Sequence, residues 1–315
     1  MRAMILAAGY GTRLRPLTDK RPKCLMPVMN RPLLGLWLGR LASWGVARAV
    51  VNTHHLADMV QAYLREQSQQ GMEIALSHEP EILGTGGGPL AARELLGPEP
   101  FLLVNADVLA TARVPELLHR LEAQDAVAVL GLVDEPRFNT VALDEAGRVL
   151  GFKGQEEGLT ATHWLTYSGL AALSPRFFDY LPPSGYSTLV QGLKAAIDAG
   201  DTVLGQPLEG FWDDLGTPER LIMLHRELAQ SPPEGLRGLS PEGPVLLGPG
   251  ARLESGARVK GFAVLGAGAV AEAGAFLNEV VLLPGARVAA GAVVEQAVLG
   301  DGFIASGRLQ GGAYA

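Results

Sequence analysis

The sequence predicts an α/β domain with a mainly parallel sheet flanked by helices, followed by a smaller domain of stacked six-residue repeats. Three observations support this. Short apolar runs alternate with helical patterns over the first 230 or so residues, a Pro-rich break follows at Ser231–Gly235, and glycine-alanine units then recur about every six residues. We therefore expect a first domain over 1–230, a linker over 231–243 and a repeat domain over 244–315.

The composition narrows the class of protein. The chain has 315 residues, of which 48% are hydrophobic and 19% charged, and its net charge is −7. This acidic balance argues against a nucleic-acid partner, and no apolar run approaches the length of a membrane span. The single cysteine, Cys24, excludes an internal disulfide and suits a reducing compartment. We expect a cytoplasmic globular protein in which Cys24 is buried.

The first domain has the strand-helix-strand rhythm of a Rossmann-like sheet, because apolar runs too short for helices alternate with longer amphipathic stretches. Thr217-Pro218-Glu219 has the residue types of a helix start, with an N-cap, a proline at the first position and an acid near the dipole. The expected strands are 4–8, 49–51, 73–77, 101–104, 126–133, 140–143 and 149–152. The expected helices are 33 to about 45, 57–67, 90–96, 175–181, 189–199 and one beginning at 218.

The stretch from Met4 to Val28 is the most informative. An apolar run, Met4–Ala8, leads into a loop with Gly9 and Gly11, and five cations follow at Arg13, Arg15, Lys20, Arg21 and Lys23. Glycines at a strand end let backbone N–H groups approach a polyphosphate, and the cations neutralise its charge. Leu14 stands where a dinucleotide fingerprint has its third glycine, and the lysine spacing of a Walker loop is absent.

Three later segments add polar or glycine-rich groups. Four glycines fall within Gly84–Gly88, and Asp107 follows the apolar run 101–104 at the edge where open α/β sheets bind ligands. Trp212-Asp213-Asp214 precedes the predicted helix start at Thr217.

The Met4–Val28 stretch closely resembles the G-x-G-T-R-L-x-P-x-T…P-K-x-L-x-P-V motif of the sugar-1-phosphate nucleotidyltransferases, or NDP-sugar pyrophosphorylases. Leu83–Gly87 resembles the family's L-G-T-x-G segment, and Trp212–Glu219 resembles its W-x-D-x-G-T-P-E segment. The resemblance covers essentially the whole chain. It implies transfer of a nucleotidyl group from an NTP to a sugar 1-phosphate, with an NDP-sugar and pyrophosphate as products.

The resemblance also implies roles for individual residues. It aligns Asp214 with a metal-binding aspartate of the family, and the neighbouring Asp213 is the alternative ligand. The family's E-K-P motif is degraded to Lys153-Gly154-Gln155, so Lys153 is a weak substitute. The implied catalytic residues are Arg13, Lys23, Asp107 and Asp214, the last two of which would hold Mg²⁺. The implied nucleotide-binding residues are Leu6, Ala7, Ala8, Gly9, Gly11, Thr12, Arg13, Gly84, Thr85, Gly86 and Asp107. The implied sugar-phosphate-binding residues are Lys23, Lys153, Tyr167, Ser168 and Gly169.

The base and the sugar stay open. The L-G-T-x-G segment favours GTP with mannose 1-phosphate, whereas the triple glycine and Tyr167-Ser168-Gly169 also suit uridylyl or thymidylyl transfer, for instance to N-acetylmuramate 1-phosphate. A non-catalytic regulatory subunit that binds nucleotide-sugar is a further alternative, disfavoured by the intact catalytic residues. A dinucleotide-dependent oxidoreductase is disfavoured by the missing third glycine.

The repeats after residue 244 are similar to the hexapeptide repeats of left-handed parallel β-helices, whose stacked strands bury an apolar row. We expect Val270, Phe276, Leu282, Val288 and Val294 to form that row. A second, acyltransferase activity in the repeats would need a histidine base, but the last histidine is His225. The repeats are therefore expected to serve homo-oligomerisation or regulation.

Overall fold

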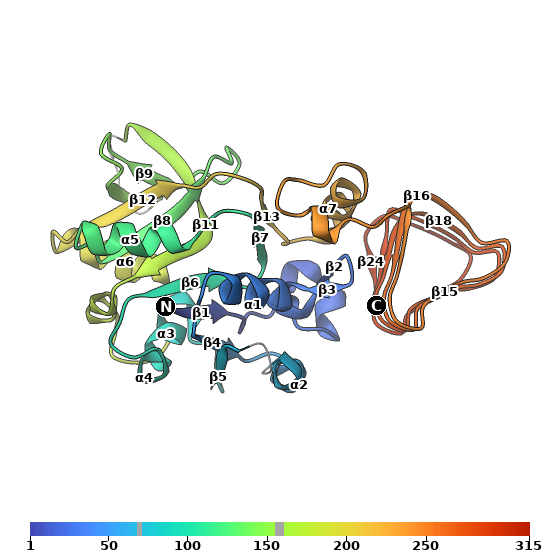
Figure 1. The fold of residues 1–315 in the computed structure, drawn as a ribbon, viewed down its shortest axis with the longest axis horizontal. Helices are drawn as coiled ribbons and strands as arrows, with labels where there is room; N and C mark the ends of the chain where they lie inside the picture. The colour runs from blue at the N-terminus through green and yellow to red at the C-terminus, as the bar shows by residue number, and fades with distance from the viewer. Residues whose placement is uncertain (68–70, 155–160) are drawn as a thin grey trace. The chain divides into compact units, whose positions relative to one another are not determined.

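The computed structural model describes residues 1–67, 71–154 and 161–315 (Figure 1). The chain forms two compact units. Unit 1 contains Met1–Gly9 and Trp37–Trp212, and unit 2 contains Tyr10–Leu36 and Asp213–Ala315. The division at 1–230, 231–243 and 244–315 stays a prediction. Within the described ranges, no helix combines the length and the apolar character that crossing a bilayer requires.

Unit 1 is built on a mixed nine-stranded sheet, which confirms the predicted α/β class. Its main path runs β10-β9-β11-β6-β1-β4-β5, and β8 pairs with β11 and β12. The pairs β6-β1, β1-β4 and β4-β5 are parallel, whereas β11 runs antiparallel to its neighbours. The strands are β1 (Arg2–Leu6), β4 (Arg48–Thr53), β5 (Glu73–His78), β6 (Phe101–Asn105), β8 (Ala128–Val133), β9 (Val141–Leu143), β10 (Val149–Phe152), β11 (His163–Leu173) and β12 (Val203–Pro207).

Helices cover the sheet of unit 1, and Leu, Val and Phe side chains fill the space between them. The helices are α2 (Ala57–Gln67), α3 (Gly84–Ala91), α4 (Arg93–Leu96), α5 (Pro115–Ala123) and α6 (Leu189–Asp198), with a short strand β7 (Val108–Ala110). Helix α1 (Leu33–Ser43) and strand β13 (Trp212–Asp214) each cross the boundary between the two units.

Several elements of unit 1 differ from the expectation. The sequence predicted no strand at β11 or β12 and no helix at α5, and the segment Pro175–Tyr180 is a 3₁₀ helix. The glycines of 84–88 were expected to precede a helix over 90–96, but they lie inside α3, which ends at Ala91. The reason is the close backbone packing of α3, described below.

Unit 2 combines the loop after β1 with the C-terminal part of the chain. Three short 3₁₀ turns (Thr12–Leu14, Leu17–Asp19, Lys23–Leu25) lead to a hairpin of β2 (Pro27–Val28) and β3 (Arg31–Pro32). Cys24, in the third of these turns, is buried as expected. Helix α7 (Pro218–Gln230) begins where predicted, with the Thr217 side chain accepting a hydrogen bond from the Arg220 N–H.

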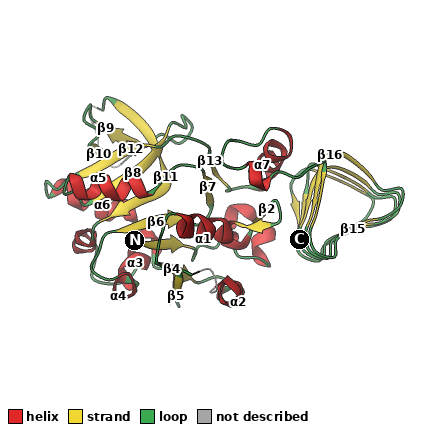
Figure 2. Cartoon of the chain, in the orientation of Figure 1, coloured by secondary structure: helices red, strands yellow, loops and turns green. Residues whose placement is uncertain are grey.

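The repeats form a parallel β-helix, which Figure 2 shows as short strands joined by tight loops. Val245 pairs with Ala263, 18 residues further on, so three six-residue units make one coil. Later coils are shorter, since Val298 pairs with Ala313, only 15 residues further on. The strands are β14 (Val245–Leu247), β15 (Arg252–Leu253), β16 (Arg258–Leu265), β17 (Val270–Ala271), β18 (Phe276–Leu282), β19 (Arg287–Val288), β20 (Val293–Glu295), β21 (Val298–Leu299), β22 (Ile304–Ala305), β23 (Arg308–Gln310) and β24 (Ala313–Tyr314).

The predicted inward row of the β-helix is only partly right. Leu282, Val288 and Val294 lie in its core. Val270 is buried as predicted, but in the first two strands of the row the core cluster contains the neighbouring residues, Ala271 and Leu277. Phe276 is partly exposed, with the Arg258 guanidinium 5.9 Å from its ring centre. Successive strand residues face opposite sides, so a one-residue error in the period exchanges inside and outside.

Candidate functional site

The carboxyl edge of the sheet in unit 1 positions the start of the glycine loop. Leu6, at the end of β1, lies in register with Asn52 of β4 and Asn105 of β6. The Ala7 N–H donates to Asn52 Oδ1 at 2.7 Å, and the Ala106 N–H donates to the Leu6 carbonyl at 3.1 Å. The chain is therefore fixed on both sides just before Ala8 and Gly9.

Asp107 lies in the turn that follows β6 at the same edge. The indole Nε1 of Trp37 donates to the Val108 carbonyl at 2.7 Å and so fixes the turn on one side. Gly169 packs against the other side. A Cβ there would lie 3.0 Å from Asn105 and Val108 side-chain atoms, and its φ of +83° also favours glycine. The structure thus brings Gly169 beside the turn that carries Asp107.

The two predicted sugar-binding side chains before Gly169 differ in their surroundings. The Ser168 hydroxyl is buried, and it donates to the Gly131 carbonyl at 2.7 Å. The Tyr167 hydroxyl is buried without a hydrogen-bond partner among the described residues, and burial raises the pKa of this phenol. The Ser168 carbonyl accepts from Trp212 Nε1 at 2.8 Å, which ties this segment to the end of unit 1.

Helix α3 packs with its backbone directly on the segment 185–188. A Cβ would lie 2.4 Å from the Ser187 carbonyl oxygen at Gly84, 2.9 Å from the Ser187 hydroxyl at Gly86 and 2.4 Å from the Gly185 carbonyl oxygen at Gly87. The Gly86 N–H donates to the Ser187 carbonyl at 2.9 Å, and the Thr85 hydroxyl accepts from the Leu189 N–H at 2.9 Å. Any side chain at the glycines would push the two segments apart.

A buried polar network connects α3 with the start of the glycine loop. Glu79, only 1% exposed, accepts hydrogen bonds from Asn52 Nδ2 at 2.6 Å and from the Leu83 N–H at 2.9 Å. A Cβ at Gly88 would lie 2.6 Å from Glu79 Oε1. Since Asn52 also binds Ala7, one network fixes both predicted nucleotide-binding segments of unit 1. Neither Asn52 nor Glu79 was predicted from the sequence to belong to the site.

In unit 2, the glycine loop folds back on itself. The Thr18 hydroxyl donates to the Gly11 carbonyl at 2.9 Å, and a Cβ at Gly11 would lie 3.0 Å from the Cβ of Lys23. Gly11 and Lys23, twelve positions apart, are therefore neighbours. Thr12 begins the first 3₁₀ turn between them.

Arg13 and Asp214 meet in unit 2 although they are far apart in the sequence. The Arg13 guanidinium lies 3.6 Å from Asp214 Oδ2, and its Nη1 would be 2.8 Å from a Cβ at Gly216. Arg220, in the first turn of α7, donates from Nε to Asp213 Oδ1 at 2.8 Å and lies 3.0 Å from Asp214 Oδ1. Arg220 was not predicted from the sequence to belong to the site, although it follows the Thr217 cap by three residues.

The two neighbouring carboxylates differ in their surroundings. Burial raises the pKa of Asp213 to about 6, while its hydrogen bonds from Arg220 act in the opposite direction. Asp214 Oδ1 is buried and accepts no hydrogen bond from the part of the chain described, despite its ion pair with Arg220. A carboxylate oxygen with unused acceptor capacity fits a cation ligand better than Asp213 does.

A metal site made by protein side chains alone is absent from the described ranges, where no group of three or more His, Cys, Asp and Glu could hold an ion. Mg²⁺ commonly binds to one or two carboxylates, with waters and phosphate oxygens as its other ligands. Asp107 in unit 1 and Asp214 in unit 2 each offer the kind of hard oxygen ligand that Mg²⁺ prefers. A site completed by a phosphate ligand therefore remains compatible with this chain.

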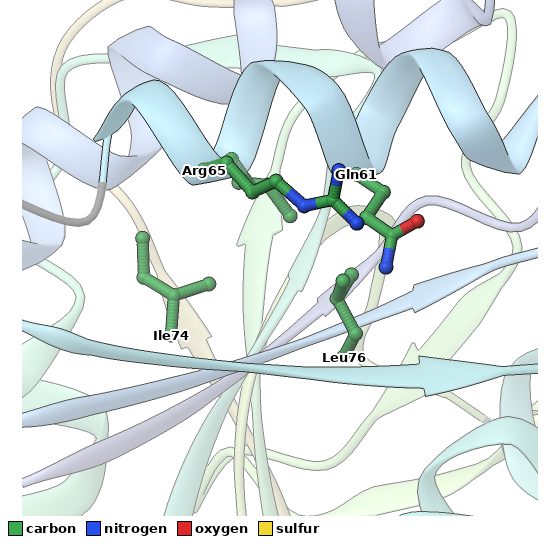
Figure 3. A pocket seen from close by; sticks show the side chains of 5 residues that line it. Gln61, Arg65, Ile74 and Leu76 are labelled. Carbon is green, nitrogen blue, oxygen red and sulfur yellow. The ribbon is translucent and has the colours of Figure 1, made fainter.

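Two features lie apart from these groups. Lys153 is exposed after β10, and its N–H donates to the Thr140 carbonyl at 2.8 Å, while Gln155 of the degraded motif lies outside the described residues. A pocket of about 210 Å³ opens between α2 and β5 (Figure 3) and contains no residue that the sequence analysis singled out. It is lined by Gln61, Leu64, Arg65, Ile74 and Leu76.

Comparison with known proteins adds an independent result. The family described as nucleotidyl transferase matches residues 2–231. The chain is 31% identical over 301 residues to mannose-1-phosphate guanylyltransferase of Mycobacterium tuberculosis, covering 93% of this chain and 83% of that relative. It is 36% identical over 224 residues to N-acetylmuramate alpha-1-phosphate uridylyltransferase of Neisseria meningitidis, covering 70% of this chain and 95% of that relative.

The fold also has a counterpart among solved structures. A crystal structure of HddC from Yersinia pseudotuberculosis complexed with GMP-PN matches with a TM-score of 0.60 at 21% identity, covering 72% of this chain and 98% of that chain. At this level of identity, the likeness concerns the fold alone.

Proposed function

We propose that this chain, which belongs to the nucleotidyl transferase family, transfers a nucleotidyl group from an NTP to a sugar 1-phosphate and releases pyrophosphate. GTP and mannose 1-phosphate are the preferred pair, because the relative named mannose-1-phosphate guanylyltransferase aligns with 93% of this chain, β-helix included. Uridylyl transfer is the second candidate, because the uridylyltransferase relative has the higher identity, 36%, over a shorter alignment.

The observation that carries the proposal is the meeting of Arg13 and Asp214 in unit 2, at 3.6 Å. This contact places the cationic end of the glycine loop next to the Asp214 carboxylate. The Oδ1 atom of that carboxylate is buried and accepts no hydrogen bond from the described residues. A cation next to a potential metal ligand is the arrangement that a triphosphate requires.

The reaction needs no protein nucleophile, because an oxygen of the sugar phosphate attacks the α-phosphorus in line. Catalysis then consists of positioning and charge neutralisation. In this proposal, Arg13 stabilises the departing β- and γ-phosphates, and Lys23 binds the α-phosphate and the sugar phosphate. Asp107 and Asp214 would hold Mg²⁺, which supplies positive charge at the α-phosphate.

Most of the segments proposed to bind the nucleotide and the sugar belong to unit 1. Backbone groups of Leu6–Gly9, with those of Gly11 and Thr12 from unit 2, approach the phosphates, and Gly84–Gly86 forms the wall for the base and ribose. Tyr167 and Gly169 are assigned to the sugar side, Tyr167 through its ring and backbone because its hydroxyl is buried. Ser168 contributes through its backbone, because its hydroxyl is bonded to Gly131. Lys153 is assigned to the sugar phosphate as a substitute for the missing E-K-P motif.

The test is a pyrophosphate-release assay with Mg²⁺, using GTP, UTP, dTTP, ATP and CTP against mannose 1-phosphate and N-acetylmuramate 1-phosphate. We expect turnover with GTP and mannose 1-phosphate, loss of turnover in Asp107→Asn, and parental turnover in Asp198→Asn. Asp198 is a matched control because it lies at the end of α6, half exposed and paired with Lys194. Absence of turnover in every combination would refute the enzyme assignment.

A binding measurement separates a catalytic protein from a regulatory subunit. A nucleotide at 100 times its Kd should add about 2.7 kcal/mol to the free energy of unfolding. Stabilisation by a nucleotide-sugar without turnover would favour the regulatory alternative, and preferential stabilisation by UTP would favour uridylyl transfer.

On this proposal the β-helix also joins copies of the chain into a homo-oligomer. Light scattering of the full chain tests this directly, and a monomer at micromolar concentration would contradict it.

A further inference from the structure

The hairpin β2-β3 directly follows Lys23 and has an unusual tip. Val28 pairs with Arg31, so Met29 and Asn30 form a two-residue turn, and their φ values are +47° and +62°. Positive φ at both positions is typical of a type I′ turn, in which asparagine is favoured but methionine is not. Contacts made by the tip must therefore stabilise it.

Both tip residues are held by the C-terminal part of unit 2. The Met29 N–H donates to His225 Nε2 of α7 at 3.1 Å, and Asn30 Nδ2 donates to the Leu265 carbonyl of β16 at 2.9 Å. His225 Nδ1 lies 2.7 Å from the Leu221 carbonyl, which can only accept, so Nδ1 carries the proton and Nε2 is the acceptor for Met29. The His225 ring stacks on Phe262 of β16, with 6.3 Å between ring centres.

A second connection lies on the other side of Lys23. Arg21 forms a two-point ion pair with Asp301, in the turn between β21 and β22, with a distance of 2.9 Å from Nε to Oδ2 and a second contact from Nη2 to Oδ1. The two side chains are 15% and 23% exposed. Such a bidentate, partly buried pair is stronger and more directional than an exposed one. Arg21 is thereby directed to the β-helix, although it is one of the five cations of the glycine loop.

We infer that the β-helix is a positioning element for the phosphate-binding loop, and that Asp301 is a positioning residue acting through Arg21 on Lys23. Lys23 lies between two anchored points, Arg21 before it and the Met29-Asn30 tip after it. Releasing one anchor lets the Lys23 backbone move while the sheet of unit 1 keeps its own hydrogen bonds. The expected change in kcat/KM rests on the proposed function. The expected movement of the Lys23 backbone does not.

The kinetic test compares Asp301→Asn with Glu279→Gln. Glu279 is a matched control, because it forms an equally bidentate pair with Arg226, at 2.7 and 2.6 Å, between the β-helix and α7 without touching the loop. We expect kcat/KM to fall roughly tenfold or more in Asp301→Asn, because small displacements of a charged group weaken transition-state binding, and to stay near the parental value in Glu279→Gln. Equal values for the two variants would overturn the inference.

A double-mutant cycle tests the route through Arg21. If Asp301 acts through Arg21, then Arg21→Ala combined with Asp301→Ala is no worse than the more damaging single substitution. If the fold-losses in kcat/KM of the two single variants multiply in the double variant, the two residues act separately, and the proposed route is contradicted.

A readout independent of activity distinguishes failure of this inference from failure of the proposed function. Hydrogen exchange of the full chain should be faster over residues 20–30 in Asp301→Asn than in the parent, and unchanged there in Glu279→Gln. If the parent shows no turnover but Asp301→Asn still exchanges faster than the parent over residues 20–30, the positioning role stands and the assigned reaction is refuted. Unchanged exchange in Asp301→Asn would refute the positioning role whatever the activity.

Discussion

Protonation of His225 should destabilise the protein between pH 6.5 and 4. The ring is fully buried, and burial lowers its pKa from 6.5 to about 4, against a smaller opposing effect of the hydrogen bond to Leu221. The unfolded chain therefore binds a proton in this interval that the folded chain does not. Stability is complete above pH 6.5 and is lost as the pH falls towards 4. At 1.36 kcal/mol per pH unit, the loss is about 3 kcal/mol.

The measurement compares the parent with His225→Gln by urea unfolding from pH 7.5 to 4, followed by circular dichroism. Asp213 has a raised pKa of about 6, so its effect has the opposite sign, favouring the folded state as the pH falls. Because both proteins contain Asp213, the difference between them isolates His225. We expect the stability advantage of the parent over the variant to shrink by about 3 kcal/mol.

An NMR titration of the histidine ring protons provides a check that does not depend on folding of the variant. A pKa near 6.5 for His225 in the parent, or a difference in stability that does not change with pH, would refute the reasoning. Either result would mean that the ring is hydrated and that its contact with Met29 is not buried.

Three further pairs of substitutions test packing and capping. Gly87→Ala should cost about 1–3 kcal/mol in thermal unfolding, because its Cβ would lie 2.4 Å from the Gly185 carbonyl oxygen. Gly39→Ala, in α1 with no atom within 4 Å of the new Cβ, should be neutral or stabilising by up to about 1 kcal/mol; equal losses would contradict the packing account. Thr217→Ala should cost about 1 kcal/mol by removing the cap of α7, and Thr217→Ser should restore most of it; a neutral Thr217→Ala would show that the cap is dispensable. Leu282→Ala, at a side chain 1% exposed in the β-helix core, should cost about 2–5 kcal/mol in chemical unfolding. Phe276→Ala should cost less, and the reverse order would restore the row predicted from the sequence.

The strands and helices with strong periodicity could be predicted from the sequence. The helix over Ala57–Gln67 and the start of α7 at Thr217 agree with the expectation, because their apolar spacing and capping residues are local signals. Strand β11 could not be recognised in the same way. Its eleven residues pair with three different strands, and its first half mixes polar and aromatic residues. Long-range pairing decides its conformation.

The site shows the same division between local and distant causes. The motifs containing Arg13, Lys23, Asp107 and Asp214 stand out in the sequence by residue type and spacing. The contacts that hold them do not, because Glu79 reaches Asn52 across 27 positions and Asp301 reaches Arg21 across 280. Likewise, the glycines of α3 predict a loop by local propensity, whereas packing on residues 185–188 makes them helical.

The glycines of α3 also bear on how this region folds. Each glycine in a helix interior costs about 1 kcal/mol relative to alanine, and α3 contains four glycines and Pro89 within eight residues. Its helical state therefore depends on the neighbouring backbone rather than on its own sequence. We therefore expect α3, the proposed base wall, to become ordered together with the segment 185–188 and to open locally when that contact is lost.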